Sequence, residues 1–188
     1  LSLHDALPIY VAARSVKWLK KITVSDEEST TQWQRRDYKC FGPNVAKPDW
    51  SKAPSIQEMP VTSAITRIER PEAGGKVNVE GYAYSGGGRE IVRVDVSIDH
   101  GKTWAQAELM GDEGKGSKSW WWKRWRFVIP DEGDKGGEVL VKATDESYNT
   151  QPEDYRGIWN QRGNLSCAWH GVHVGPGEAA NAVKAAEK

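Results

Sequence analysis

A series of short segments with strict two-residue alternation, beginning at Val61, most limits what this chain can fold into. In IVRVDVSI, residues 91–98, the side chains of Val92, Val94, Val96 and Ile98 are predicted to share one face of a strand. A period of two is typical of a half-buried β-strand, because successive side chains point to opposite faces of the sheet. Further segments of this kind are AITRIE, KVNVEGYAYS, WWWKRWRFVIP, EVLVKATD and CAWHGVHV.

Turn sequences rich in glycine separate these segments. DHGKTW, residues 99–104, predicts a hairpin turn in which Gly101 takes the positive φ that such a turn needs. Seven short strands are expected between residues 61 and 174. Strands of this length, separated by such turns, predict a mostly β fold, an immunoglobulin-like antiparallel β-sandwich.

The rest of the chain divides into four further parts. Residues 1–9, LSLHDALPI, resemble the translation of a sequencing-adapter oligonucleotide and are interpreted as an artefact, so that the chain belongs to something longer. Residues 10–46 are strand-like at first and then lack a clean period. Residues 47–60 contain three prolines and are interpreted as a linker. Residues 175–188, rich in glycine, proline and then alanine, are expected to be a disordered tail.

The tryptophan-rich segment SWWWKRWRF, residues 119–127, places bulky aromatic side chains on both faces of its predicted strand. One face would hold Trp120, Trp122, Arg124 and Arg126, and the other Trp121, Lys123, Trp125 and Phe127. One of these faces should enter the core. For the other face three interpretations stay open: an interface with another protein, ordinary packing, or an aromatic platform for a ligand.

The charge of the chain is concentrated locally. The net charge is zero, so no global field attracts nucleic acid or a membrane, and no apolar run approaches the ~20 residues of a membrane-spanning helix. Between Tyr10 and Trp50, however, eight cations face five anions, four of the cations lying in RSVKWLKKI. This segment is either a solvated basic face or part of a pocket for an anion.

Tyr38, Arg162 and the two cysteines are the candidate chemical groups of the sequence. Tyr38, beside Arg35 and Arg36 in QWQRRDYK, could donate a hydrogen bond to an oxyanion that the arginines bind. Arg162, between aromatic residues and before a glycine, could equally be a stacked structural residue. No catalytic triad, Cys–His pair or paired carboxylates can be recognised, and two cysteines alone predict neither a disulfide framework nor a metal site. The residues alone therefore predict a β-sandwich with a basic N-terminal appendage.

Five stretches in order carry a more specific signal: ARSVKWL, WQRRDYK, APSIQEMPVTSAIT, GYAYSGGGREIVRVDVSIDHGKTW and IWNQRGNLSCAWH. Together they resemble the C-terminal part of the sulfite oxidase family of molybdenum enzymes, over residues 10–174. The resemblance implies an immunoglobulin-like homodimerisation domain at 61–174. It also implies that residues 10–46 are an irregular remnant, the end of an α+β molybdopterin-binding domain.

The resemblance also implies roles for individual residues. Arg14, Ser15 and Lys17 would contact the pterin and its phosphate, Tyr38 would be the active-site tyrosine, and Arg162 would line the anion pocket. The cysteine that binds molybdenum in this family has no counterpart in the chain, so no metal ligand is predicted here. The chain alone is therefore expected to be inactive.

The activity implied for the parent protein is oxidation of sulfite to sulfate by oxo transfer at molybdenum, with electrons passing to a b-type haem and cytochrome c. A homodimer is expected, without nucleic acid or membrane as partner. The compartment would be the mitochondrial intermembrane space for an animal-type parent and the peroxisome for a plant-type parent. Two alternatives remain: a nitrate reductase, which shares KWLKKI and GYAYSGGG but typically has Met in place of Arg162, and a non-catalytic β-sandwich binding module.

Overall fold

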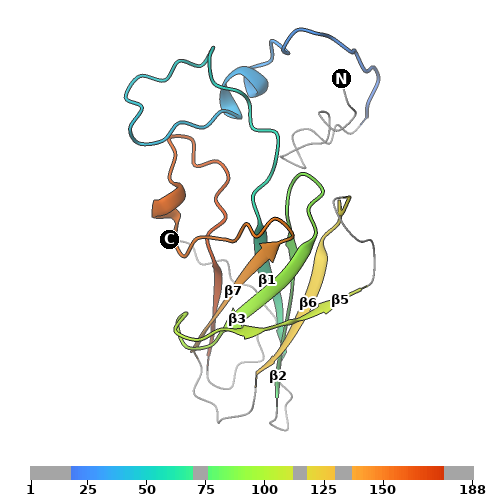
Figure 1. Cartoon of the computed structure of the whole chain (residues 1–188), viewed down its shortest axis with the longest axis vertical. Helices are drawn as coiled ribbons and strands as arrows, with labels where there is room; N and C mark the ends of the chain where they lie inside the picture. The colour runs from blue at the N-terminus through green and yellow to red at the C-terminus, as the bar shows by residue number, and fades with distance from the viewer. Residues whose placement is uncertain (1–17, 70–75, 112–117, 130–136, 176–188) are drawn as a thin grey trace. The chain divides into compact units, whose positions relative to one another are not determined.

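The structure is a computed structural model that describes residues 18–69, 76–111, 118–129 and 137–175 (Figure 1). The chain forms two compact units. The first comprises Leu1–Met59 and Tyr155–Ser166, and the second comprises Pro60–Asp154 and Cys167–Lys188. The predicted artefact at 1–9 lies outside the described residues, as does the predicted tail from residue 176 onward.

The second unit is built from two antiparallel sheets of four strands each. One sheet has the order β1-β2-β6-β5, with β1 Thr62–Glu69, β2 Val77–Tyr84, β6 Lys123–Ile129 and β5 Glu108–Met110. The other has the order β4-β3-β7-β8, with β4 Ala105–Gln106, β3 Ile91–Ser97, β7 Gly137–Asp145 and β8 His170–Val174. The predicted antiparallel β fold is confirmed. The described residues contain eight strands against the predicted seven, and the short strands β4 and β5 are not among the alternating segments of the sequence.

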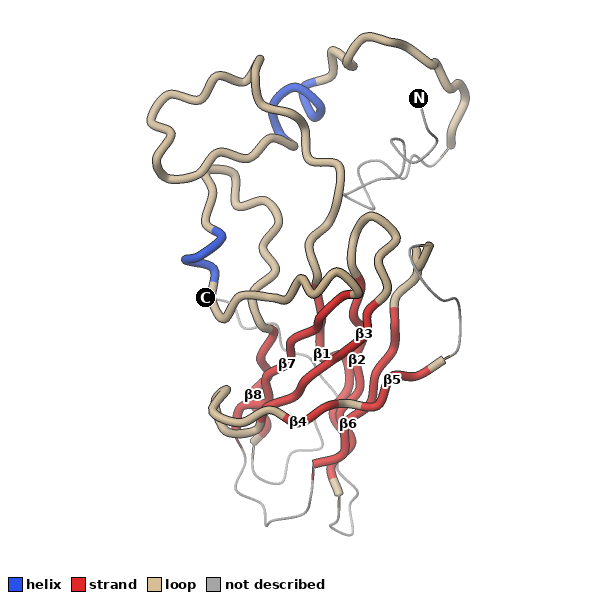
Figure 2. Tube along the Cα trace, viewed as in Figure 1, coloured by secondary structure: helices blue, strands red, loops and turns tan. Residues whose placement is uncertain are grey.

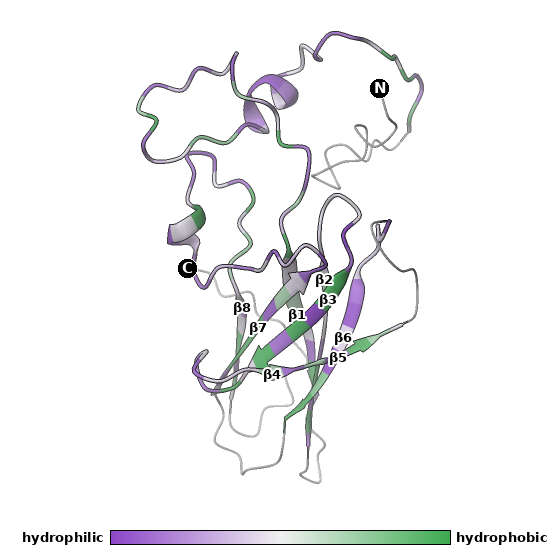
Figure 3. Cartoon of the chain, in the orientation of Figure 1, coloured by the Kyte–Doolittle hydropathy of each residue, from purple (hydrophilic) through white to green (hydrophobic). Residues whose placement is uncertain are grey.

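The core of the sandwich consists of the inward side chains of both sheets. Strand β2 alternates buried and half-buried residues without a break, as its sequence predicts. Figure 3 shows hydrophobic and hydrophilic stretches following one another along β3. Trp125 of β6 is fully buried and lies opposite Gly81 of β2. A Cβ atom at Gly81 would overlap the Ala64 carbonyl oxygen and the Trp125 indole, so the tryptophan fits only because its neighbour is glycine. The predicted division of the Trp-rich segment is confirmed within β6, since Arg124 and Arg126 are exposed and Lys123 and Trp125 are buried. It does not extend to Trp121, which precedes the strand and is exposed.

The prediction that Val92, Val94, Val96 and Ile98 share one face is wrong at both ends of the strand. Val94 and Val96 are buried, but Val92 and Ile98 are exposed, whereas Ile91 is buried. The register between β3 and β7 shifts between Ile91 and Arg93. A bulge of this kind inserts one residue and so moves the side chains before it, Ile91 and Val92, to the opposite face. Ile98 lies beyond the end of β3 at Ser97, so the strand pattern does not extend to it. The predicted hairpin is present after β3, which pairs with β4, and Gly101 has φ 80°.

The first unit is irregular in its described part. It contains a single π-type helical turn, η2 Trp33–Asp37, and a short 3₁₀ helix, η3 Tyr155–Ile158, joined by loops (Figure 2). The strand-like expectation is wrong for residues 18–24, which are exposed and form no strand. Residues 47–59 of the predicted linker belong to this unit, and so does Tyr155–Ser166, which the prediction had placed within the sandwich domain.

Candidate functional site

The turn η2 sets the positions of the first group of candidate residues. The Tyr38 amide donates to the Trp33 carbonyl over 3.0 Å and ends the turn, with Tyr38 at φ −101° and ψ 34°. Arg35 and Arg36 are exposed in the last turn, whereas Asp37 and Tyr38 are half-buried. Ile56 fixes the backbone further, because its amide donates to the Tyr38 carbonyl over 2.7 Å.

The loop around Arg162 is shaped by two asparagines. The side-chain oxygen of Asn160 accepts from the amides of Arg162 and Asn164, both over 3.1 Å. Its Nδ2 donates to the Asn164 carbonyl over 2.7 Å, and Gly163 has a φ of 65°. Asparagine side chains commonly cap their own backbone in this way, and glycine tolerates the left-handed conformation. The result is a closed loop with Arg162 near its tip.

This loop contacts the turn η2 through Asp37. Arg162 Nη2 donates to Asp37 Oδ1 over 2.7 Å, and Asn164 Nδ2 donates to the Asp37 carbonyl over 2.8 Å. The guanidinium carbon of Arg162 also lies 5.1 Å from the ring centre of Trp50, within cation–π range. Arg162 and Tyr38, which the resemblance assigned to one active site, therefore belong to adjoining segments of the first unit.

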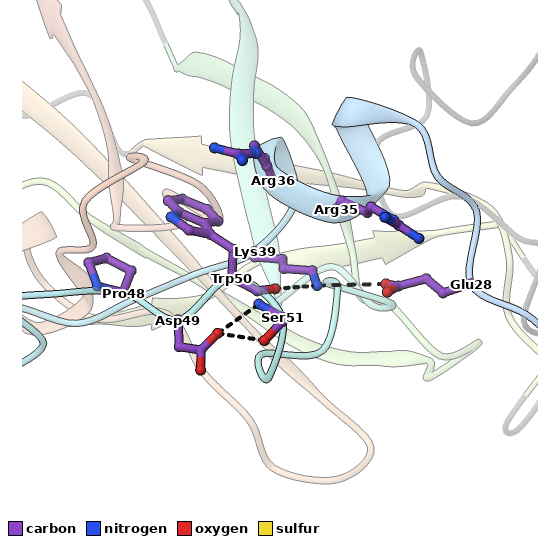
Figure 4. A pocket seen from close by; sticks show the side chains of 8 residues that line it. All are labelled: Glu28, Arg35, Arg36, Lys39, Pro48, Asp49, Trp50 and Ser51. Atoms are coloured by element: carbon purple, nitrogen blue, oxygen red, sulfur yellow. Dashed lines mark hydrogen bonds and ion pairs between the residues drawn. The ribbon is translucent and has the colours of Figure 1, made fainter.

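A pocket of about 700 Å³ opens in the first unit beside Trp50 (Figure 4). It is lined by Glu28, Arg35, Arg36, Lys39, Pro48, Asp49, Trp50 and Ser51. Figure 4 shows the Arg35 and Arg36 side chains leaving the turn in different directions. The Lys39 side chain is buried and donates to the Trp50 carbonyl over 2.8 Å, with Glu28 Oε1 at 3.7 Å. Lys39 therefore fixes the pocket wall.

The charges that line the pocket favour an anion. Three cations face two carboxylates, Glu28 and Asp49. Hydrogen bonds from the Ser51 hydroxyl and amide lower the pKa of Asp49 against the effect of desolvation, so this carboxylate stays ionised at neutral pH. Arginine guanidinium groups form charge-assisted, bidentate hydrogen bonds with phosphate and carboxylate groups. The excess of cations over carboxylates in this lining suits an oxyanion.

The cysteines do not fit a metal-binding role. A cysteine must lose its proton to bind a metal, yet burial raises the pKa of Cys40, against a smaller opposing effect of Asn164, and burial also raises the pKa of Cys167. Within residues 18–69, 76–111, 118–129 and 137–175, no preassembled group of metal-ligating side chains is in place. In this unit, the side chains that suit a phosphorylated cofactor are basic, such as Arg35 and Arg36 at the pocket, because they carry the charge opposite to that of a phosphate.

The sequence predictions overlap with this arrangement in part. Arg14, Ser15 and Lys17 lie outside the described residues, so their assignment stays a prediction. Sequence reasoning missed the roles of Asp37, Trp50 and the two asparagines of the loop. A signal was present for the asparagines, because Asn160 and Asn164 flank Gly163 at a spacing that suits a capped loop.

A second surface of interest lies on the second unit. The Trp122 ring stacks on Tyr82 with 4.4 Å between ring centres and 17° between planes, and Tyr84 continues the stack at 6.1 Å from Trp122. Trp122 is nevertheless 57% exposed. The three interpretations of this face, an interface, ordinary packing and a ligand platform, all stay open. A separate observation concerns membranes: within the described ranges, neither short helical segment has the length or the apolar composition of a membrane-spanning helix.

Comparison with protein families gives one clear match. The model of the Mo-co oxidoreductase dimerisation domain matches residues 53–176. Sulfite oxidase of Gallus gallus is 50% identical over 169 residues, which cover 87% of this chain and 37% of the relative. Mitochondrial sulfite oxidase of Homo sapiens is 50% identical over 173 residues, 89% of this chain and 32% of the relative. The chain thus spans about a third of the length of these curated relatives.

A more distant relative and a solved structure complete the comparison. Nitrate reductase [NADH] 1 of Phaseolus vulgaris is 34% identical over 184 residues, 88% of this chain and 21% of the relative. The crystal structure of the sulfane dehydrogenase SoxCD from Paracoccus pantotrophus aligns with a TM-score of 0.60 and 24% identity. The alignment covers 81% of this chain and 38% of that one, and it supports the fold.

Proposed function

The chain belongs to the Mo-co oxidoreductase dimerisation domain family, and from this premise we propose that it is the C-terminal part of a molybdenum-dependent sulfite oxidase. It would contribute homodimerisation and part of the anion pocket of that enzyme. The observation that carries the proposal is the ion pair between Asp37 and Arg162, because it joins the two motifs that the resemblance places at one active site. The 50% identity to sulfite oxidases, against 34% to a nitrate reductase, supports the substrate class.

The chain's own residues would act on the anion by charge and orientation. Arg162, held by Asp37, would bind a sulfite oxygen, and the Tyr38 hydroxyl would donate to the charge that develops there. Arg14, Ser15 and Lys17 would hold the phosphate of the pterin by charge-assisted hydrogen bonds. A bound molybdenum cofactor would supply oxo transfer and two-electron chemistry, its metal-binding cysteine coming from outside this sequence.

We further propose the partners that this role requires in the intact protein. Electrons would leave one at a time to a b-type haem or to cytochrome c. The exposed Trp122 stack would lie in the homodimer interface, since aromatic side chains are enriched at interface centres. The human relative is mitochondrial, which favours that compartment for an animal-type parent.

A hybrid enzyme tests the proposal. The matching C-terminal part of the Gallus gallus sulfite oxidase is replaced by this chain, and cofactor content, dimerisation, sulfite oxidation and nitrate reduction are measured. We expect a loaded dimer that oxidises sulfite and does not reduce nitrate. Arg162→Met should raise the KM for sulfite at least tenfold, or about 1.4 kcal/mol. A loaded dimeric hybrid that reduces nitrate, or that oxidises no sulfite, would overturn the proposal.

A further inference from the structure

Trp50 belongs both to the lining of the pocket and to the surroundings of Arg162, and the proposed function gives it no role. Trp50 is half-buried, and its side chain lines the pocket (Figure 4). The guanidinium carbon of Arg162 lies over the same indole ring, 5.1 Å from the ring centre. One side chain of the first unit is therefore shared by the pocket and by the loop that carries Arg162.

The backbone of Trp50 is held by its neighbours. Lys39 Nζ donates to the Trp50 carbonyl over 2.8 Å, and the Lys39 side chain is only 2% exposed. A buried ammonium group needs such an acceptor, because burying it without hydrogen bonds would be costly. Asp49 Oδ1 accepts from the Ser51 amide over 3.1 Å and from the Ser51 hydroxyl over 2.6 Å. The residues before and after Trp50 are thereby fixed in one turn.

The ring of Trp50 is held by Phe41. The two ring centres lie 4.8 Å apart with 75° between the planes, which is the edge-to-face arrangement that aromatic pairs favour. Phe41 is buried, and its carbonyl accepts from the Gln161 amide over 3.1 Å. Gln161 directly precedes Arg162 in the chain. Phe41 therefore supports both the indole ring and the loop that brings the guanidinium to it.

The contact with Trp50 leaves hydrogen-bond donors of Arg162 unused. Asp37 Oδ1 accepts from Arg162 Nη2 over 2.7 Å, whereas within the described ranges neither Nε nor Nη1 of Arg162 has a protein acceptor. A tryptophan ring attracts a cation through its electron-rich face and offers no carboxylate or carbonyl oxygen. This contact therefore holds the charge while the remaining N–H groups stay available for an anion, which a second carboxylate would not allow.

We propose that Trp50 is a positioning residue of the anion site, which holds the Arg162 guanidinium by cation–π attraction so that its free N–H groups can bind a sulfite oxygen. This inference rests on the proposed function, because it concerns the same arginine. A single hydrogen bond to Asp37 leaves the guanidinium free to turn about that bond. The indole ring removes this freedom, and a binding group that is already oriented loses less entropy when the anion arrives.

Variants of Trp50 in the hybrid enzyme provide the first test. We expect Trp50→Leu to raise the KM for sulfite about fivefold, equivalent to about 1 kcal/mol, with a much smaller change in kcat. Trp50→Phe keeps a weaker aromatic face and should lie between the parent and Trp50→Leu. Adding Trp50→Leu to Arg162→Met should raise KM no further, because the tryptophan acts through the arginine. Trp159→Leu, at an exposed tryptophan of the same unit, is the matched control and should leave KM unchanged.

Fluorinated tryptophan at position 50 separates the charge of the ring from its shape. Each added ring fluorine withdraws electron density from the ring face with little change in size, so the KM for sulfite should rise stepwise with the number of fluorines. The same series at position 159 should have no effect. If KM does not depend on the number of fluorines at position 50, ring charge does not hold Arg162 and the proposal is overturned. The series also decides if Trp50→Leu fails to fold.

A measurement on the chain alone separates this inference from the proposed function. The Nε–Hε NMR signal of Arg162, assigned by its absence in Arg162→Met, should carry a ring-current shift that disappears in Trp50→Leu. An unchanged signal in Trp50→Leu would overturn the proposal, and so would an active hybrid whose KM is unaffected by that substitution. A hybrid that oxidises no sulfite would instead overturn the proposed function, while loss of the shift would still show that Trp50 positions Arg162.

Discussion

Arg162 donates to Asp37 over 2.7 Å although 125 positions separate the two residues. The pair is only partly buried, with side-chain exposures of 36% and 27%, and ion pairs of this kind contribute about 0–1 kcal/mol to stability. The ion pair therefore matters less for stability than for the position of the Arg162 guanidinium. Asp37 directs the guanidinium, and the ring centre of Trp50 lies 5.1 Å from the guanidinium carbon.

Asp37→Asn should release this guanidinium without unfolding the protein. In the hybrid enzyme we expect the KM for sulfite to rise several-fold while the denaturation midpoint of the chain changes little. Combining Asp37→Asn with Arg162→Met should add almost nothing to the effect of Arg162→Met alone, because one substitution acts through the other residue. Fully additive effects on KM would contradict the positioning role. Glu108→Gln, which breaks the exposed pair with Arg126, is the control.

Trp122→Ala should weaken self-association of the chain. The exposed ring of Trp122 stacks on Tyr82, and truncating a central interface aromatic commonly costs about 2 kcal/mol. Sedimentation equilibrium of the chain and its variant gives the dimer dissociation constant, which should rise about thirtyfold. Trp159→Ala, at an exposed tryptophan of the first unit, should leave it unchanged. An unaltered constant for Trp122→Ala would remove this face from the interface.

Asp145→Asn should be among the most destabilising single changes in the second unit. Asp145 is fully buried and accepts from the Ser85 hydroxyl, Arg89 Nε and the Asn149 amide. Burial raises its pKa, but hydrogen bonds from Asn149, Ser85 and the Ser147 amide outweigh burial and lower it, so the carboxylate is charged. Asparagine would weaken the hydrogen bonds that this buried carboxylate accepts, at a cost of about 2–3 kcal/mol. Urea unfolding measures it, with Asp49→Asn, an exposed carboxylate, as the control.

The sandwich could be predicted because alternation reports local burial. Strand β2 follows its pattern at every residue, and Trp125 enters the core with Lys123 as the face assignment requires. The faces of Val92 and Ile98 could not be predicted in this way. The register shift near Val92 depends on the neighbouring strand, and Ile98 lies beyond the end of β3 at Ser97, which alternation alone does not mark.

The sequence predicted which residues belong to the candidate site, but not the contacts that place them. Resemblance assigned Tyr38 and Arg162 to one active site, but it did not identify the contacts that bring their segments together. Their proximity depends on Asn164, which donates to the Asp37 carbonyl across 127 positions, and on Gln161, which donates to the Val45 carbonyl. Contacts of such long range are set by the fold of the whole unit, which no local period encodes. For residues 18–24 the local pattern predicted a strand-like segment, but these residues form no strand and their apolar side chains are exposed.

His170 should make the second unit lose stability as the pH falls below neutrality. Its Nδ1 accepts from the Ile65 amide over 3.2 Å, joining β8 of one sheet to β1 of the other at a register shift in β1. Burial lowers the pKa of His170 below 6.5. Above that value the imidazole is neutral in both the folded and the unfolded chain, and its contribution is complete. As the pH falls below it, the unfolded chain takes up a proton that the folded chain resists.

The free energy of unfolding should therefore decrease with falling pH, by at most about 1.4 kcal/mol per pH unit for a single group. Urea unfolding at a series of values from about pH 7.5 to about pH 5.5 measures this slope, above the range in which carboxylates titrate. His170→Asn, which keeps an acceptor near the Ile65 amide, should flatten the slope even if it lowers stability throughout. His173→Gln removes an exposed histidine and should not flatten it. If the slope in His170→Asn equals that of the parent chain, the pH dependence originates elsewhere and His170 is not its source.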